Sequence, residues 1–185
     1  MKIGVLALQG DFREHVATLT QAGATGREVR TPADLDEVEG LVLPGGESTT
    51  IAKLAHSAGL VEPVRGRIEA GMPALGTCAG MIALASEVLD GEPLFASVDV
   101  TVRRNAYGRQ VESFETDLDV EGVAHPVRGV FIRAPWVERV GTHVHVLATH
   151  EDRPVVLEQG NVVVASFHPE LVGETGLHAY WLEKV

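Results

Sequence analysis

The chain has 185 residues, of which 45% are hydrophobic and 22% charged, and this balance argues against a disordered chain or a coiled coil. Its formal net charge of −11 at pH 7 argues against nucleic acid or an anionic membrane as a partner, since both are themselves negatively charged. The apolar N-terminal run is too short to span a membrane, and no signal-peptide cleavage site follows it. A single cysteine cannot form an internal disulfide, which suits a reducing cytosol. We therefore expect a cytoplasmic chain that folds as one domain over residues 1–185.

Strands and helices alternate in the first half of the sequence. The short apolar run at 2–8 predicts a buried strand, and apolar residues at helical spacing predict a helix over 12–22 that Asp11 would cap. Further elements follow the same alternation: strands near 28–30, at 40–44 and in the segment that runs into Cys78, and helices from Ser48 or Thr49 to Gly59, at 61–70 and at 81–85. This order is typical of βαβ units, in which a parallel sheet is covered on both faces.

Strand-like segments dominate after about residue 93. They are separated by turn residues and lie at 95–102, 111–114, 129–132, 140–148, 155–158 and 162–167. Gln159-Gly160-Asn161 predicts a hairpin turn between the last two strands, and 177–185 predicts a closing helix. The predicted fold is therefore α/β, with a β-rich second half.

The only cysteine, Cys78, lies in the sequence Gly76-Thr77-Cys78-Ala79-Gly80, between an apolar stretch and a helix-like segment. This arrangement is typical of a nucleophile elbow, a sharp strand-to-helix turn that flanking glycines allow. A helix N-terminus and a protonated histidine both lower the pKa of a thiol, so the position suits a nucleophile. A lone buried cysteine is otherwise more often a small core residue, and the surrounding motif is what favours a functional role.

An imidazole and a carboxylate stand two residues apart in Phe167-His168-Pro169-Glu170-Leu171. Residues two apart in an extended segment project to the same side, so Glu170 can orient one imidazole nitrogen while the other faces Cys78. As oxyanion-hole donors we expect the backbone N–H of Ala79, directly after the nucleophile, and Gly46, in the loop after a neighbouring strand. These groups all follow predicted strands, and sites in open α/β sheets form at the carboxyl ends of strands.

Two other polar clusters have competing interpretations. His143 and His145 alternate on a predicted strand, with His150 beyond them, and this resembles half of a zinc site. Because no paired cysteines or carboxylate cluster accompany them, we expect a strand with a polar face and no metal site. Arg103-Arg104 and Arg109 form either an anion-binding patch or the solvated end of a strand.

Several segments together resemble the class I glutamine amidotransferases: Leu43-Pro44-Gly45-Gly46-Glu47-Ser48-Thr49-Thr50, Gly76-Thr77-Cys78-Ala79-Gly80 and Phe167-His168-Pro169-Glu170-Leu171. Three more segments narrow the resemblance to the glutaminase subunits of pyridoxal 5′-phosphate synthases: Ala7-Leu8-Gln9-Gly10 with Arg13-Glu14-His15, Arg104-Asn105-Ala106-Tyr107-Gly108-Arg109-Gln110, and Phe131-Ile132-Arg133-Ala134-Pro135. The resemblance covers essentially the whole chain. Two departures are Tyr107, where Phe is more usual, and 171–176, which lacks a Thr-Asp-rich run.

The resemblance implies a fold, a reaction and a partner. The fold is a three-layer α/β sandwich around a mixed, mostly parallel, flavodoxin-like sheet. Cys78 becomes the nucleophile, His168 the base and Glu170 its orienter, and glutamine binding falls to Gly46, Glu47, Ser48, Arg104, Ile132 and Arg133. L-Glutamine would be hydrolysed through a γ-glutamyl thioester, without cofactor or metal. The ammonia would pass to a separate, activating synthase subunit that docks near Gln9, Gly10 and the Gly45-Gly46 loop and makes pyridoxal 5′-phosphate.

Two alternatives remain open at the level of sequence. One is the glutaminase subunit of another amidotransferase, in histidine or purine synthesis, with the same triad and a different partner. The other is a non-catalytic regulatory module. Such modules typically lose a triad member, whereas Cys78, His168 and Glu170 are all present.

Overall fold

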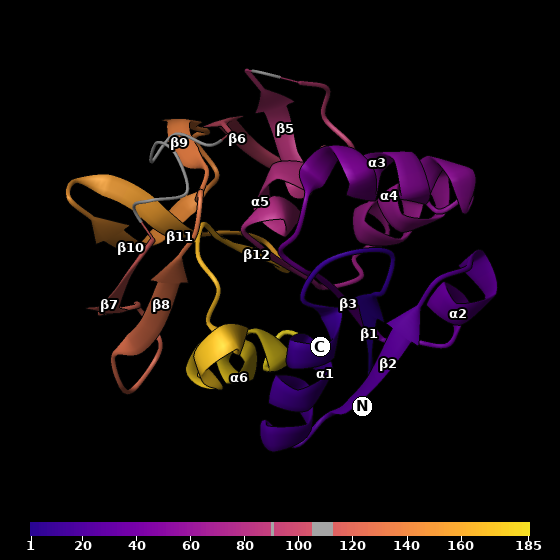
Figure 1. Ribbon diagram of the computed structural model, residues 1–185, viewed down its shortest axis with the longest axis horizontal. Coiled ribbons are helices and arrows are strands. Elements are labelled where there is room, and N and C mark those ends of the chain that lie inside the picture. The colour runs from indigo at the N-terminus through magenta and orange to yellow at the C-terminus, as the bar shows by residue number, and fades with distance from the viewer. Residues whose placement is uncertain (90, 105–112) are drawn as a thin grey trace.

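A computed structural model describes residues 1–89, 91–104 and 113–185 (Figure 1). In this part of the chain a seven-stranded sheet has the order β10-β11-β12-β4-β3-β1-β2. Pairing is parallel from β2 through β12, and β11 and β10 add on antiparallel. The strands are β1 Lys2–Leu6, β2 Thr25–Val29, β3 Gly40–Leu43, β4 Ala74–Thr77, β10 His145–His150, β11 Arg153–Gln159 and β12 Val162–Ala165.

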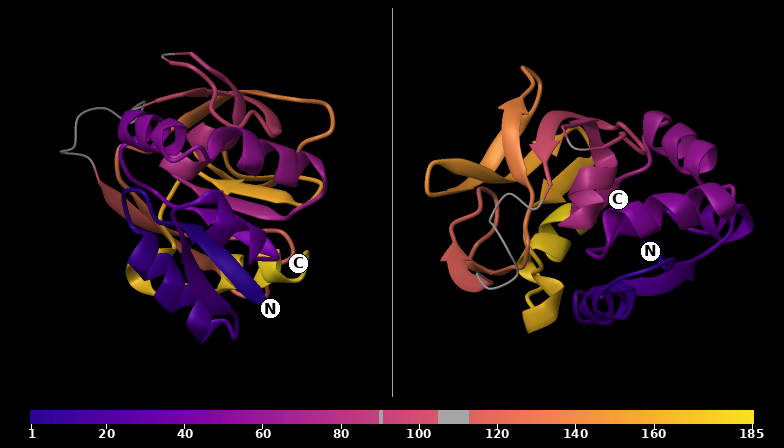
Figure 2. Two further views of the ribbon diagram at one scale, coloured as in Figure 1. Left: turned by 90° about the vertical axis from the view of Figure 1, so that its right-hand side faces the viewer. Right: turned by 45° about the horizontal axis from the view of Figure 1, so that its top comes forward.

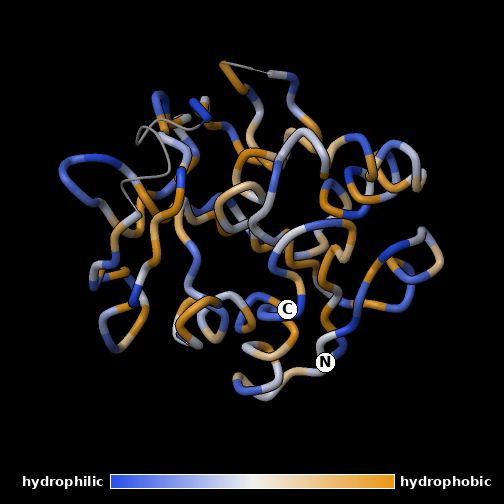
Figure 3. The backbone as a smooth tube through the Cα atoms, viewed as in Figure 1, coloured by the Kyte–Doolittle hydropathy of each residue, from blue (hydrophilic) through white to orange (hydrophobic). Residues whose placement is uncertain are grey.

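Helices cover both faces of this sheet because its strands are apolar on both sides. Leu41 and Leu43 pack into one core with the helices α2 Pro32–Asp36, α3 Ser48–Ser57, α4 Val61–Glu69 and α5 Ala79–Leu84. Val42, between them, packs into the opposite core with α1 Phe12–Gln21 and α6 Gly176–Leu182. Figure 2 shows α3 and α4 on one side of the sheet and α1 and α6 on the other, and Figure 3 shows hydrophobic residues running through the centre. The expected three-layer α/β sandwich with a mixed, mostly parallel sheet is confirmed.

Two smaller sheets account for the β-rich second half. β5 Ala85–Val88, β6 Val98–Arg103 and β9 Trp136–Val140 form a three-stranded sheet that packs into the core of α3–α5. β7 Phe114–Leu118 and β8 Val127–Phe131 form an antiparallel ribbon that packs into the core of α1 and α6. Among the described residues, no helix has the length and apolar character needed to cross a membrane.

The structure corrects several boundaries. The expected strand at 140–148 is two strands, because Val144 N–H donates to the carbonyl of Gly141 in a turn between β9 and β10. The expected helix at 81–85 is α5, which begins at Ala79 and ends at Leu84, directly before β5. The short helix α2 was not predicted: its five residues are too few to show a period, although Thr31 and Asp34 form a capping box. Of the strand expected at 111–114, residues 111 and 112 lie outside the described residues and β7 begins at Phe114.

Two helix starts also differ from expectation. Glu47, rather than Ser48 or Thr49, caps α3: its carboxylate accepts hydrogen bonds from the backbone N–H groups of Thr49 and Thr50 at 3.0 and 2.7 Å. Asp11 stands at the N-cap position of α1, but its side chain makes no capping hydrogen bond. That carboxylate is therefore available for another contact.

Glycine substitutions on α5 and α4 test how tightly the layers are packed. A Cβ on Gly80 would lie 2.0 Å from the carbonyl oxygen of Leu43, so Gly80→Ala must push α5 away from β3. We expect it to lower the free energy of unfolding by about 1–3 kcal/mol. Gly66 lies inside α4 with open space around it, and Gly66→Ala should raise that free energy by about 0.5–1 kcal/mol. Urea denaturation followed by circular dichroism measures both, and a Gly80→Ala protein as stable as the wild type would contradict the packing.

Candidate active site

Loops from four neighbouring parallel strands meet at one edge of the central sheet. Gln9 follows β1, Gly46 follows β3, Cys78 follows β4 and His168 follows β12. These loops line a pocket of about 420 Å³. The predicted catalytic, oxyanion and substrate residues at its wall are Gly46, Glu47, Ser48, Cys78, Ala79, Arg104, Ile132, Arg133 and His168; Gln9, Gly10, Asp11, Thr49, Ile82 and Leu171 complete the lining.

The strand-to-helix turn at Cys78 has the backbone strain expected of an elbow. Cys78 has φ 48° and ψ −104°, in the positive-φ region that residues other than glycine rarely adopt. Its N–H donates to the carbonyl of Ala165 at 2.8 Å, which ties the turn to the end of β12. A Cβ on Gly76 would lie 2.7 Å from the backbone of Gly80, so the close approach of α5 to β4 requires Gly76, as its approach to β3 requires Gly80. Cys78 is 7% exposed, stands at the N-cap position of α5 and lines the pocket.

His168 and Glu170 form the contact that the sequence predicted, by a different backbone route. Nδ1 of His168 lies 2.8 Å from Oε1 of Glu170, and the Glu170 side chain is completely buried. The segment is not extended: Pro169 is helical and Glu170 begins a 3-10 turn, η2, over Glu170–Val172. His168 is itself fixed by a β-bridge to Val130, whose strand β8 leads into Ile132 and Arg133.

The charge balance around His168 favours its protonated form. Burial lowers the pKa of His168, but hydrogen bonds to Asp11, Cys78 and Glu170 outweigh it, so the pKa lies well above the ordinary imidazole value. Burial raises the pKa of Glu170, and the hydrogen bond with His168 opposes that rise. A protonated imidazole beside the sulfur is the partner on which thiolate nucleophiles depend.

Asp11 is a site residue that sequence reasoning missed. Its Oδ2 lies 3.3 Å from Nδ1 of His168, the nitrogen that also faces Glu170. Unlike Glu170, the Asp11 side chain is 34% exposed and lines the pocket. The sequence signal that could have revealed Asp11 is its position in the loop after β1. That strand ends at the same sheet edge as the strands before Cys78 and His168.

The Gly45-Gly46 loop is confined on two sides. The carbonyl of Gly45 accepts a hydrogen bond from Asp11 N–H at 3.1 Å, and Oε1 of Gln9 accepts one from Glu47 N–H at 2.7 Å. A Cβ on Gly45 would lie 2.1 Å from Cε1 of His168, so only glycine lets the loop pass the imidazole. Gly46 stands in this loop, and Ala79 is the first residue of α5, where backbone N–H groups have no partner within the helix.

The residues expected to bind the substrate line the same pocket as Cys78. Arg104 reaches across the pocket, with Nη1 3.3 Å from the Ser48 hydroxyl and 3.2 Å from the Thr49 hydroxyl, and the carbonyl oxygen of Ile132 lies 3.9 Å from Sγ of Cys78. Arg133 has φ 46°, which turns the chain directly after Ile132.

The Glu47 side chain is engaged within its own helix. Hydrogen bonds from the Thr50 hydroxyl and from the backbone N–H groups of Thr49 and Thr50 outweigh desolvation and lower the pKa of Glu47 to about 2. Its carboxylate thus holds the start of α3.

Of the other polar clusters, Arg104 lines this pocket, whereas His143, His145 and His150 do not. His145 and His150 lie at opposite ends of β10, and His143 lies in the turn before it. Within 1–89, 91–104 and 113–185, one group of side chains has atoms close enough to share a metal ion, and it consists of Asp11, His168 and Glu170. Arg103 pairs with Glu138, whereas Arg109 and Tyr107 lie outside the described residues.

Replacing Asp11 tests the charge balance at His168. Asp11→Asn removes a carboxylate that raises the pKa of His168, so that pKa should fall, as measured by NMR titration of the imidazole. Glu14→Gln is the matched control, because it makes the same charge change on the exposed side of α1. An unchanged pKa in Asp11→Asn would contradict the contact.

Comparison with known proteins places the chain in a family. The SNO glutamine amidotransferase family matches residues 5–185. Curated relatives described as pyridoxal 5′-phosphate synthase subunit PdxT include one from Streptomyces avermitilis, 57% identical over 99% of this chain and 93% of its own length. Another, from Mycobacterium ulcerans, is 54% identical over 100% of this chain and 96% of its own length.

Solved structures also resemble this chain. A crystal structure described as a glutamine amidotransferase matches with a TM-score of 0.93 and 50% identity, over 98% of this chain and 97% of that chain. The structure of PurLQS from Thermotoga maritima matches with a TM-score of 0.75 over 99% of this chain and 95% of that chain, and its 18% identity supports the fold alone. The chain belongs to the SNO glutamine amidotransferase family.

Proposed function

We propose that this chain is the glutaminase subunit of a cytoplasmic pyridoxal 5′-phosphate synthase, hydrolysing L-glutamine to L-glutamate and ammonia within a single domain over residues 1–185. The observation that carries the proposal is the site itself: a cysteine on a strained elbow shares a pocket with a histidine that is held by a buried carboxylate. Relatives that match the chain over nearly its whole length are described as subunits of that synthase, and this favours the pathway.

The chemistry follows from the positions of three side chains. The Cys78 thiolate attacks the side-chain amide carbon of glutamine, and the negative charge develops on the amide oxygen. The N–H groups of Ala79 and Gly46 are the proposed donors to that oxygen. His168 gives its proton to the departing amine, which leaves as ammonia, and Glu170 holds the imidazole in orientation. His168 then takes a proton from water, and the resulting attack on the γ-glutamyl thioester releases glutamate and restores Cys78.

Substrate recognition is assigned to other residues that line the same pocket. The Arg104 guanidinium supplies the cation that a glutamine α-carboxylate needs, and the Ser48 hydroxyl beside it offers a further polar contact. Backbone groups of Gly46, Glu47, Ile132 and Arg133 complete the cradle, since the Glu47 carboxylate is already engaged at the start of α3.

The partner is proposed to be the synthase subunit that uses the ammonia. Its docking face includes the mouth of the pocket at Gln9, Gly10 and Gly45-Gly46, where Leu171 leaves 39% of its surface exposed. Docking there covers the site and keeps ammonia from bulk water. Pyridoxal 5′-phosphate is the product of the assembly, and no step of the glutaminase reaction draws on it.

The alternatives are weaker. The match to PurLQS from Thermotoga maritima is 18% identical and supports a shared fold only, so it does not favour another amidotransferase pathway. A non-catalytic module would have no need for a strained cysteine beside a charged imidazole, and the cost of such a turn argues for retained chemistry.

Removal of the sulfur tests the reaction. Cys78→Ala should lower ammonia release from glutamine by about 10³-fold or more, measured with the purified chain in complex with a pyridoxal 5′-phosphate synthase. His168→Ala should behave similarly, and His125→Ala, at an exposed position, should retain wild-type activity. Wild-type activity should rise when the synthase is added. Continued ammonia release by Cys78→Ala in the presence of the synthase would sink the proposal.

Neighbouring arginines offer a matched test of substrate binding. Arg104→Met should raise the KM for glutamine about tenfold or more, because it removes the cation facing the α-carboxylate. Arg103→Met breaks a pair with Glu138 on the outer face of β6 and should leave KM unchanged. Steady-state kinetics of the complex measure both, and equal KM values for the two variants would refute the assignment.

A further inference from the structure

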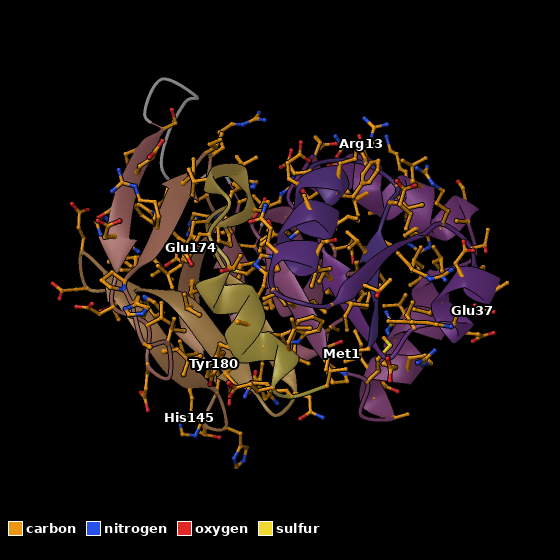
Figure 4. The ribbon with its side chains drawn as sticks, turned by 90° about the horizontal axis from the view of Figure 1, so that it is seen from below. Met1, Arg13, Glu37, His145, Glu174 and Tyr180 are labelled. Carbon is orange, nitrogen blue, oxygen red and sulfur yellow. The ribbon has the colours of Figure 1, made fainter. Side chains whose placement is uncertain are left out.

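Two fully buried histidines lie directly behind the catalytic carboxylate. His15 on α1 and His178 on α6 are both 0% exposed. Nδ1 of His15 lies 2.9 Å from Nε2 of His178, and the rings are 5.1 Å apart between centroids. Figure 4, like Figure 1, shows α6 running alongside α1, so residues far apart in sequence meet here. Neither histidine lines the pocket.

The other ring nitrogen of His15, Nε2, lies close to both Thr77 and Glu170. Nε2 lies 3.0 Å from the hydroxyl oxygen of Thr77, the residue before Cys78. The same Nε2 lies 3.5 Å from Oε1 of Glu170, the oxygen that faces His168. The His15 imidazole thus contacts Thr77, at the end of the strand before the nucleophile, and also Glu170, the carboxylate that orients His168.

Both histidines are neutral. Burial, and then the positive charges that His178 and His168 would carry, lower the pKa of His15 well below its usual value. Burial lowers the pKa of His178 to about 4, despite the opposing effect of the Glu174 carbonyl. A neutral imidazole has one N–H donor and one acceptor nitrogen, so the short contact between the rings fixes the two tautomers relative to each other.

Electrostatics determines which of the two histidine rings donates the hydrogen bond between them. A proton on Nε2 of His15 faces two oxygens, one of them the Glu170 carboxylate, whereas a lone pair there would oppose that carboxylate. With its proton on Nε2, His15 offers Nδ1 as an acceptor, and the N–H of His178 Nε2 donates to it. In the reversed arrangement His178 would carry its proton on Nδ1, the nitrogen left to face the Glu174 carbonyl, but His15 would turn its lone pair toward Glu170. The charged Glu170 oxygen outweighs the neutral carbonyl, because hydrogen bonds to ionised acceptors are the stronger ones.

We propose that His15 is a positioning residue for the triad, whose Nε2–H donates to the Thr77 hydroxyl and faces the Glu170 carboxylate, and that His178 sets its tautomer. The proposal rests on the proposed glutaminase function. It explains why a core position between two helices holds a pair of imidazoles where apolar side chains would avoid the loss of hydration. Glu170 is then faced by His168, by Asp11 before α1, by His15 on α1 and, through His15, by His178 on α6.

The tautomers can be read in the wild-type protein. NMR of the 15N-histidine-labelled chain should show the proton on Nε2 in both His15 and His178, with neither ring titrating between about pH 5.5 and 8. A proton on Nδ1 of His15, or titration of His15 in that range, would overturn the proposal. This measurement does not depend on glutaminase activity.

Variants test the consequence for catalysis in the complex with the synthase. His15→Phe should lower kcat about 10-fold or more with little change in the KM for glutamine, since it acts through Glu170 and not through the substrate. His15→Gln keeps a donor and an acceptor and should recover most of the loss, and His178→Phe should fall between. Leu19→Ala is the control, because it removes a fully buried side chain from the same helix and should lower stability without lowering kcat.

The outcomes separate the two proposals. Wild-type kcat in His15→Phe, or an equal loss of kcat in Leu19→Ala, would refute the role of His15 while leaving the glutaminase intact. An inactive wild-type complex would instead refute the proposed function, and the NMR result would still decide the hydrogen-bond arrangement.

Discussion

The parallel pairing of β4 with β12 sets the positions of the cysteine and the histidine on which the rest of the site depends. In this register Thr77 stands opposite Ala165, so Cys78 and His168 leave neighbouring strands at almost the same level. The hydrogen bond from Cys78 N–H to the Ala165 carbonyl extends the pairing one residue into the elbow. A slip of one residue would turn the side chains of β4 to the opposite faces and separate the sulfur from the imidazole. The site thus depends on the same main-chain bonds that hold the central sheet.

Behind Cys78 and His168, several polar side chains lie where water cannot reach them. Glu170, His15 and His178 have no exposed side-chain surface, and the cost of burying them is offset by contacts with one another. Asp11 differs, because part of its carboxylate remains at the pocket surface. One imidazole, that of His168, therefore lies between an inaccessible carboxylate and one that solvent, substrate or a docked partner can reach.

Local sequence patterns were sufficient for groups on regular strand ends and insufficient for groups joined by tertiary packing. The elbow at Cys78 and the loop at Gly46 could be predicted because glycines, apolar strands and helix starts are neighbours in the chain. The contact between His168 and Glu170 was predicted for the wrong reason, since Pro169 bends the segment into a 3-10 turn where an extended one was expected. Asp11 and His178 were missed because their partners lie more than a hundred residues away, at positions that only helix packing brings together.

The positive φ of Cys78 has a consequence for how this chain can change. Glycine tolerates such a backbone, whereas a side chain there costs of order 1 kcal/mol or more. Selection for thermal stability alone would therefore favour glycine at position 78, because the fold would become more stable without the cysteine side chain. On the proposed function, cysteine is kept at this turn for its chemistry, and a descendant that no longer needs that chemistry should lose the cysteine before it loses the fold.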